Sequence, residues 1–175
     1  MKETLTDLKE RRSVRSYEPR QISNDELNAV LEAGTWAPTG AGSQSPVIVC
    51  IQDADLIAKI EKMNAAAFGH PEAHTFYGAP TLLIVFVDKT APTPIEDGSL
   101  VLGNLLNAAQ AVGLGSCWIH RAREFSESDE GKAMMANWGL DADKYVGVGN
   151  CILGYAAAAT PAPAPRKEGY VIKVG

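Results

Sequence analysis

The sequence has few cysteines and no excess of positive charge, and each shortage excludes a class of protein. Three of its 175 residues are cysteine, at positions 50, 117 and 151. Each lies in an apolar run, so we expect buried, reduced thiols rather than the disulfide framework of a small secreted protein. The formal net charge of −5 leaves no broad basic face, which argues against a nucleic-acid-binding protein.

Long uninterrupted hydrophobic runs are also missing. The most apolar stretch, residues 100–117, is broken by glycine, asparagine and glutamine. Such a stretch predicts a buried helix rather than a membrane span. Residues 1–7 have no apolar core of the kind found in a signal peptide. We therefore expect a cytoplasmic protein with neither a membrane nor a nucleic acid as partner.

The glycine-rich nucleotide-binding motifs are absent too. In residues 147–154 the gap between the second and third glycine is too long for the dinucleotide fingerprint, and the run reads as a strand. Residues 113–115 follow a predicted helix and precede a strand, the reverse of the motif's order. His70 and His74 are four apart, but Pro71 opposes a helix between them, so no metal site is predicted.

The strongest positive signal is the arginine segment, residues 11–17 (RRSVRSY). Three arginines crowded together in an acidic protein repel one another, so we expect an anion beside them. A guanidinium matches phosphate oxygens bidentately, and Ser13 adds a neutral donor. A second basic pair, Arg166-Lys167, serves the same phosphate only if the fold brings both ends of the chain together. The alternative is a helix end with solvated arginines.

The hydrophobic pattern predicts helices that alternate with strands. Ser23 and Glu26 form a capping box, while Asp53 and Asp97 are expected helix caps. The first strands are apolar on both sides, so helices should cover both faces of the sheet. Helices are expected at 5–12, from 24 to near 34, after Asp53, at 97–112 and at 126–137, and strands at 47–51, 81–87, 116–119 and 145–153.

The C-terminal part lacks the alternating helix and strand patterns of the rest of the chain. Residues 156–165 are an alanine-proline tract, which cannot join a core and is extended. Ten residues of polyproline geometry reach roughly 30 Å. Residues 170–174 then alternate like an edge strand. We expect residues 1–175 to form one domain, with residues 156–175 as a C-terminal arm that docks on a partner subunit.

Taken in order, these segments resemble the nitroreductase family of FMN-dependent oxidoreductases. The resemblance covers nearly the whole chain, and the order and spacing of its pieces are specific. It implies an α+β fold with a central mixed sheet wrapped by helices, in an intertwined homodimer with FMN at the interface. The matching pieces are residues 11–17, 37–39 with Gln44, 79–80, Asp97 with 104–106, 113–119, 153–155 and 165–167.

The resemblance also implies which residues bind the cofactor. Gly42 stands where the family often has asparagine, which removes one hydrogen-bonding side chain near the flavin. No catalytic side chain is required, because the flavin carries the chemistry. Arg11, Arg12, Ser13, Arg166 and Lys167 would serve the phosphate, Arg15 the N1–O2 edge of the ring, and Trp118, Ile119 and His120 the side of the ring near N5, while Pro38, Thr39, Gly40 and Gln44 would come from the other subunit.

The implied reaction is hydride transfer from NAD(P)H through flavin N5 to a nitroaromatic, a quinone or an activated alkene. We expect residues 68–77 to face the substrate as a stacking lid, through Phe68, His70, His74, Phe76 and Tyr77. The alternative for this segment is a plain surface loop. Two other functions stay open: a flavin-binding carrier or sensor without turnover, and a module whose basic termini grip an anionic partner such as RNA, which the acidic charge disfavours.

Overall fold

The fold is built on one antiparallel sheet with helices on both faces. The computed structural model describes residues 3–160 and 162–175. The sheet has the strand order β1-β2-β4-β3, so β1 and β3 form its edges. The strands are β1 (Val47–Ile51), β2 (Thr81–Asp88), β3 (Gly115–Ile119) and β4 (Tyr145–Gly154).

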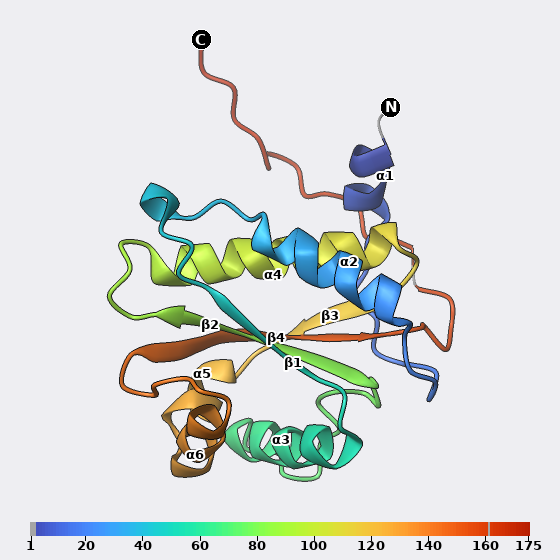
Figure 1. Cartoon of the computed structure of the whole chain (residues 1–175). Helices are drawn as coiled ribbons and strands as arrows, with labels where there is room; N and C mark the ends of the chain where they lie inside the picture. Colours follow the sequence, from blue (N-terminus) through green and yellow to red (C-terminus); the bar gives the residue numbers. More distant parts are fainter. Residues whose placement is uncertain (1–2, 161) are drawn as a thin grey trace.

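Helices form a layer above and a layer below this sheet (Figure 1). α2 (Asn24–Thr35) and α4 (Pro94–Ala111) cover one face. The other face is covered by α3 (Ala54–Ala67), α5 (Ala122–Glu127) and α6 (Asp129–Asn137). Two shorter elements, α1 (Glu3–Glu10) and the 3-10 turn η1 (Gly40–Gly42), lie above the α2/α4 layer. Among the described helices, none combines the length and apolar character that crossing a bilayer requires.

Each face of the sheet has its own hydrophobic core. Residues 81–87 of β2 are all buried, and alternate side chains enter opposite layers. Leu82, Ile84 and Phe86 pack with α3, α5 and α6, whereas Leu83 and Val85 pack with α2 and α4. The prediction that helices cover both faces, and the α+β class, are therefore confirmed.

The expected mixed sheet is wrong for the four strands. Every pair, β1·β2, β2·β4 and β3·β4, is antiparallel. Within residues 3–160 and 162–175, parallel pairing is limited to the isolated bridge between Ser13 and Ser116. Continuous apolar strands are typical of parallel sheets because such sheets are covered on both faces. Here helices cover both faces of an antiparallel sheet. A continuous apolar run therefore indicates that a strand is buried on both faces, and it does not indicate the direction of the strand.

The helix boundaries differ from the prediction in three places. Asp97 is not an N-cap: α4 begins at Pro94, a residue well suited to the first helical turn, after the N-cap Thr93. The segment predicted as one helix at 126–137 is two, because Ser128 is extended and caps α6 through the N–H of Gly131. The first helix is also shifted, to Glu3–Glu10. The capping box at Ser23 is present as predicted.

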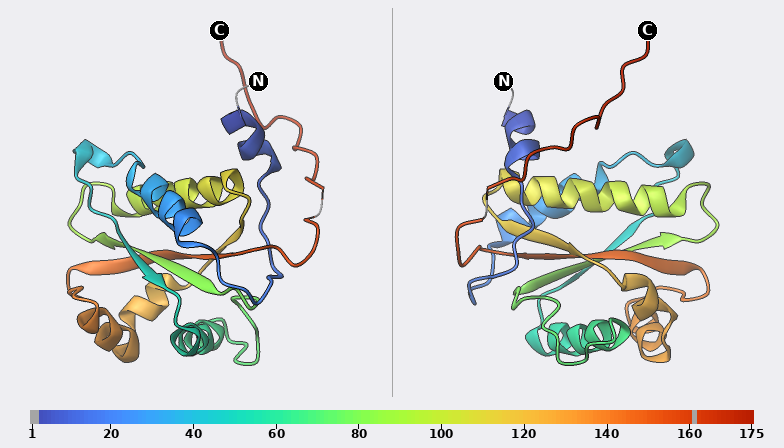
Figure 2. Two further views of the ribbon diagram at one scale, coloured as in Figure 1. Left: turned by 45° about the vertical axis from the view of Figure 1, so that its right-hand side comes forward. Right: turned by 180° about the vertical axis from the view of Figure 1, so that it is seen from behind.

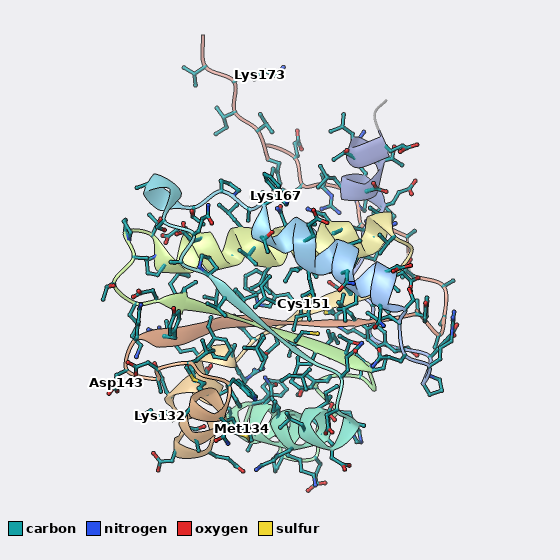
Figure 3. All side chains as sticks on the ribbon, viewed as in Figure 1. Lys132, Met134, Asp143, Cys151, Lys167 and Lys173 are labelled. Atoms are coloured by element: carbon teal, nitrogen blue, oxygen red, sulfur yellow. The ribbon has the colours of Figure 1, made fainter. Side chains whose placement is uncertain are left out.

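All three cysteines are free thiols, but they are not equally buried. Cys117 and Cys151 are enclosed, and Figure 3 labels Cys151 between the layers. Burial raises the pKa of the Cys151 thiol well above its ordinary value. Cys50 is exposed, which corrects the expectation that all three thiols are buried. The reason is its place on the edge strand β1.

The arm leaves the sheet after β4 and does not return to it. Tyr17 forms an antiparallel bridge with Ala156, and the chain then passes α1 and projects away from the body (Figures 1 and 2). The predicted edge strand at 170–174 is not formed by the single chain. Its apolar side chains are exposed instead, with Ile172 at 83% and Val174 at 95%.

Candidate cofactor and substrate site

The arginine segment is held in an extended conformation against the ends of β3 and β4. The N–H of Val14 donates to the carbonyl of Ser116 at 2.9 Å, and the N–H of Ala157 donates to the carbonyl of Ser16 at 3.0 Å. The side chains of Val14 and Tyr17 are buried and anchor the segment. Gly115 permits this approach, since a Cβ there would lie 2.9 Å from a methyl carbon of Val14. The intervening polar residues are left facing outward.

The two basic ends of the chain meet in this fold. Arg11, Arg12 and Ser13 line one side of a hollow of about 700 Å³, and residues 162–166 of the arm, which end in Arg166, line the other. We call this the terminal hollow. Figure 3 shows Lys167 on the arm, and its ammonium lies 5.6 Å from the centre of the Tyr170 ring. Arg11, Arg12 and Arg166 therefore line one hollow that is large enough for a phosphate.

Arg12 supplies the observation that best fits an anion there. Its Nη1 donates to the carbonyls of Lys9 at 2.7 Å and Arg11 at 2.6 Å, which closes the C-terminal end of α1. Its Nε is buried and has no hydrogen-bond partner among the described residues. A buried donor without an acceptor costs about 1–3 kcal/mol. A phosphate oxygen in the terminal hollow would remove that cost, so the residues fit the phosphate group of FMN.

Arg15 lies in an adjoining hollow. It is exposed and lines a space of about 260 Å³ together with Ser13, Ser16 and residues 158–160 of the arm. Ser13 lines both hollows, so the two lie next to each other along the arginine segment.

β3 offers its backbone edge next to the arginine segment. Ser116 faces this outer edge, because it bridges to Ser13. Backbone N–H groups alternate between the two sides of a strand, so the N–H of Trp118 points to the same edge. The indole of Trp118 packs the other way, close enough that a Cβ on Gly149 would lie 2.5 Å from its Nε1. Trp118 thus presents a backbone donor, Ile119 is buried, and His120 is exposed at the strand's end.

The residues predicted to face the substrate do not all lie at the surface. Phe68 is 45% exposed and lies edge-on to His70, with ring centres 4.7 Å apart. The exposed ring of His74 lies 4.0 Å from Glu61, and Tyr77 is 38% exposed. Phe76, in contrast, is only 1% exposed and belongs to the core beneath the sheet. Phe76 therefore supports the segment from inside, which corrects its assignment to the substrate face.

Comparison with known proteins decides the family. The family profile described as the nitroreductase family matches residues 8–155. The chain belongs to the nitroreductase family. A nitroreductase with bound FMN from Bacteroides fragilis aligns over 100% of both chains with a TM-score of 0.92 and 29% sequence identity. A second, from Desulfitobacterium hafniense, has a TM-score of 0.86 and 22% identity over 99% of this chain and 100% of that one, and shows the fold.

A curated relative supports the same family. It is a protein of Archaeoglobus fulgidus that is named provisionally as an NADH dehydrogenase/NAD(P)H nitroreductase. It is 30% identical over 124 residues, which is 68% of this chain and 68% of the relative. The family predicted from the order and spacing of the matching segments is therefore confirmed.

One group of predicted nitroreductase residues lies apart from the others. Pro38, Thr39, Gly40 and Gln44 are held near the N-terminal end of α4, where the N–H of Gly40 donates to Asp97 Oδ1 at 2.9 Å. The arginine segment lies beside Ser116, just after the C-terminal end of the same helix. The rise of the helix from Asp97 to Ala111 separates them by roughly 20 Å. Figure 1 shows η1 and α1 above opposite ends of α4.

Asp97 has a role that helix signals did not reveal. It is 2% exposed, and its Oδ1 accepts from both Gly40 N–H and the hydroxyl of Thr93, at 2.9 and 2.8 Å. It therefore pins the loop that carries residues 38–44 to the first turn of α4. An aspartate at the start of an apolar helix is the sequence pattern of an N-cap. An aspartate that binds a neighbouring loop gives the same pattern, so the sequence alone predicted a cap.

Two buried asparagines hold the end of β3 and were also missed. Nδ2 of Asn64 donates to the carbonyl of His120 at 2.7 Å, and Nδ2 of Asn150 donates to the same carbonyl at 3.0 Å and to that of Ile119 at 3.2 Å. They are 4% and 1% exposed. The available signal was a single amide inside each of two otherwise apolar runs. No spacing rule links such residues to a strand elsewhere in the chain.

Proposed function

We propose that this protein is an FMN-dependent NAD(P)H oxidoreductase that reduces a nitroaromatic, a quinone or an activated alkene. The observation that carries the proposal is the unpartnered, buried Nε of Arg12 in a hollow lined by Arg11, Ser13 and Arg166. The relative from Bacteroides fragilis binds FMN, and the one from Archaeoglobus fulgidus is named for NAD(P)H. The first name supports FMN as the cofactor, and the second supports NAD(P)H as the electron donor.

The residues of the chain would divide the work by position. Arg11, Arg12, Ser13 and Arg166, with Lys167 next to them, hold the phosphate through charge-assisted hydrogen bonds. Arg15 places a positive charge beside the ring, and the Trp118 N–H provides a donor on the outer edge of β3. Bound FMN supplies the hydride chemistry. The protein's contribution is to bind, orient and shield.

We further propose a homodimer in which each site takes residues from both copies. One protomer separates residues 38–44 from the arginine segment by roughly 20 Å along α4. It also leaves Tyr170, Val171 and Ile172 of the arm exposed. A second copy that receives the arm and supplies residues 38–44 would explain both observations. Residues 1–175 of each copy would then form one domain, with residues 156–175 as its arm. Three free thiols favour the cytoplasm.

Purified protein is expected to be yellow and to release FMN on denaturation. NADH or NADPH should bleach the colour anaerobically, and a quinone should restore it, with absorbance near the flavin maxima as the readout. Bound FMN that no nicotinamide reduces would instead support the carrier or sensor. A colourless protein that neither binds added FMN nor gains thermal stability from it would contradict both.

Replacement of Arg15 by glutamine tests the proposed division of work. Loss of the charge should lower the two-electron reduction potential of bound FMN by roughly 20–40 mV, since 30 mV corresponds to about 1.4 kcal/mol for a two-electron couple. The measurement is a spectroelectrochemical titration of the holoenzyme. An unchanged potential with weakened FMN binding would assign Arg15 to anchoring instead.

A further inference from the structure

Arg121 is a cation without an anionic partner among the described residues. It is half-buried, and its guanidinium carbon lies 4.0 Å from the centre of the Phe68 ring. Across the described residues, no carboxylate lies within ion-pair distance of Arg121 and no acceptor takes a hydrogen bond from it. Stacking on an aromatic face occupies the plane of a guanidinium and leaves its N–H edge free for a second partner. An arginine in that state is prepared for a planar anion.

The backbone of Arg121 is held in a conformation that arginine rarely adopts. Its φ is +75°, in the left-handed region that favours glycine. Such conformations persist where the surroundings enforce them, and they gather at functional sites. Here the enforcing contacts are the two amide donors, from Asn64 and Asn150, on the preceding carbonyl of His120. Both asparagine Oδ1 atoms are buried without partners among the described residues, so the contact is retained at a cost.

The surroundings of Arg121 form a partly cationic hollow. A space of about 310 Å³ is lined by His120, Arg121, Arg123 and Glu124, with Ile95 and Val148 on its apolar side. Arg123 is already paired with Glu127 at 3.1 Å. Glu124 is the carboxylate in the lining and is exposed. Arg121 is therefore the cation whose charge is available to an entering molecule.

We propose that Arg121 determines substrate specificity by binding an oxyanion, a carboxylate or a phosphate, carried by the electron donor or the electron acceptor. This inference rests on the proposed function, because Arg121 follows directly on the β3 residues proposed to lie beside the flavin. The guanidinium edge takes two oxygens of the anion bidentately, while Phe68 stacks behind it. Substrates that carry such a group are preferred over neutral ones of the same shape.

The two sources of the anion are separated by the choice of probe. Benzoate against benzamide represents the carboxylate of an aromatic acceptor. Adenosine 2′,5′-bisphosphate against AMP represents the extra phosphate of NADPH. Each probe is titrated into the oxidised holoenzyme by calorimetry, with the visible spectrum of the bound flavin recorded in parallel. Neither measurement requires turnover.

Arg121→Gly is the informative variant, because glycine accepts the left-handed backbone and loses only the side chain. In one of the two pairs, the wild-type protein should bind the probe that carries the additional anionic group (benzoate or adenosine 2′,5′-bisphosphate) about tenfold or more tighter than its partner (benzamide or AMP). Arg121→Gly should remove that preference, and Arg121→Lys should restore it in part. The matched control is Arg123→Gln, which removes one positive charge from the same hollow and should keep the preference.

Several results would overturn the inference. Equal binding of the two probes within both pairs would do so. An equal loss in Arg121→Gly and Arg123→Gln would also do so, because it would indicate general electrostatics. Weakened FMN affinity in Arg121→Gly would assign the residue to the cofactor. A holoenzyme that NAD(P)H reduces but that shows no anion preference leaves the proposed function standing. A protein that holds no FMN removes both.

Discussion

Deletion of residues 158–175 is expected to weaken FMN binding at least about 100-fold while leaving the sheet and both cores folded. The arm supplies one whole wall of the terminal hollow, including Arg166. A hydrogen bond to a charged group contributes about 1.5–3 kcal/mol. The deletion removes the bonds that Arg166 would make to the phosphate, and it also removes the wall that encloses the phosphate. Neither core cluster contains a residue beyond Ala156. Fluorescence titration with FMN, together with circular dichroism, measures the two effects.

The same deletion should convert the proposed homodimer to a monomer in sedimentation experiments. Arg166→Gln is the matched control, because it removes one charge and keeps the arm. We expect this variant to remain a dimer and to lose only about tenfold in FMN affinity. A shortened chain that binds FMN as tightly as the full chain would show that the arm does not form the site.

Gly147→Val is expected to lower the free energy of unfolding by about 3 kcal/mol or more. A Cβ at this position would lie 2.1 Å from the carbonyl oxygen of Ala122. That obstacle is backbone and cannot rotate away. The N–H of Gly147 also donates to the hydroxyl of Ser126 at 3.0 Å, which ties β4 to α5. Denaturant unfolding followed by circular dichroism gives the free energy.

The control for Gly147 is Gly103→Ala. Gly103 lies within α4, and a Cβ there meets nothing within 4 Å. We expect its stability to stay within about 1 kcal/mol of the wild type, since alanine is also the better helix former. Comparable losses in both variants would show that the close approach of β4 to α5 is not what demands glycine.

The local elements of this fold were predictable from the sequence, whereas their spatial order was not. Val47–Ile51 and residues 81–87 form strands as predicted, because continuous apolar runs of that length leave few other solutions. The order β1-β2-β4-β3 depends on which faces the helices cover, and no single run encodes that. Ser128 divides a predicted helix because its hydroxyl caps α6, a choice that competes closely with continuing α5.

For the candidate site too, the types of residue could be predicted from the sequence, whereas their positions in space could not. Arginine-rich and serine-bearing segments indicate an anion site by their chemistry, so the sequence predicts Arg12 and Arg166 there, and the fold brings both residues to the terminal hollow. Phe76 was assigned wrongly, since an aromatic residue in a loop has the same sequence signature whether it faces out or into the core. Asn64, Asn150 and Arg121 were missed because their importance arises from contacts between segments 30 or more residues apart.

The roughly 20 Å between residues 38–44 and the arginine segment has a consequence for how activity depends on the amount of protein. If each site draws on two copies, complete sites form by a second-order reaction. At concentrations below the dimer dissociation constant, the number of sites then rises with the square of the protein concentration. In this concentration range, doubling the expression of the protein would raise its activity about fourfold. Dilution alone would therefore inactivate it.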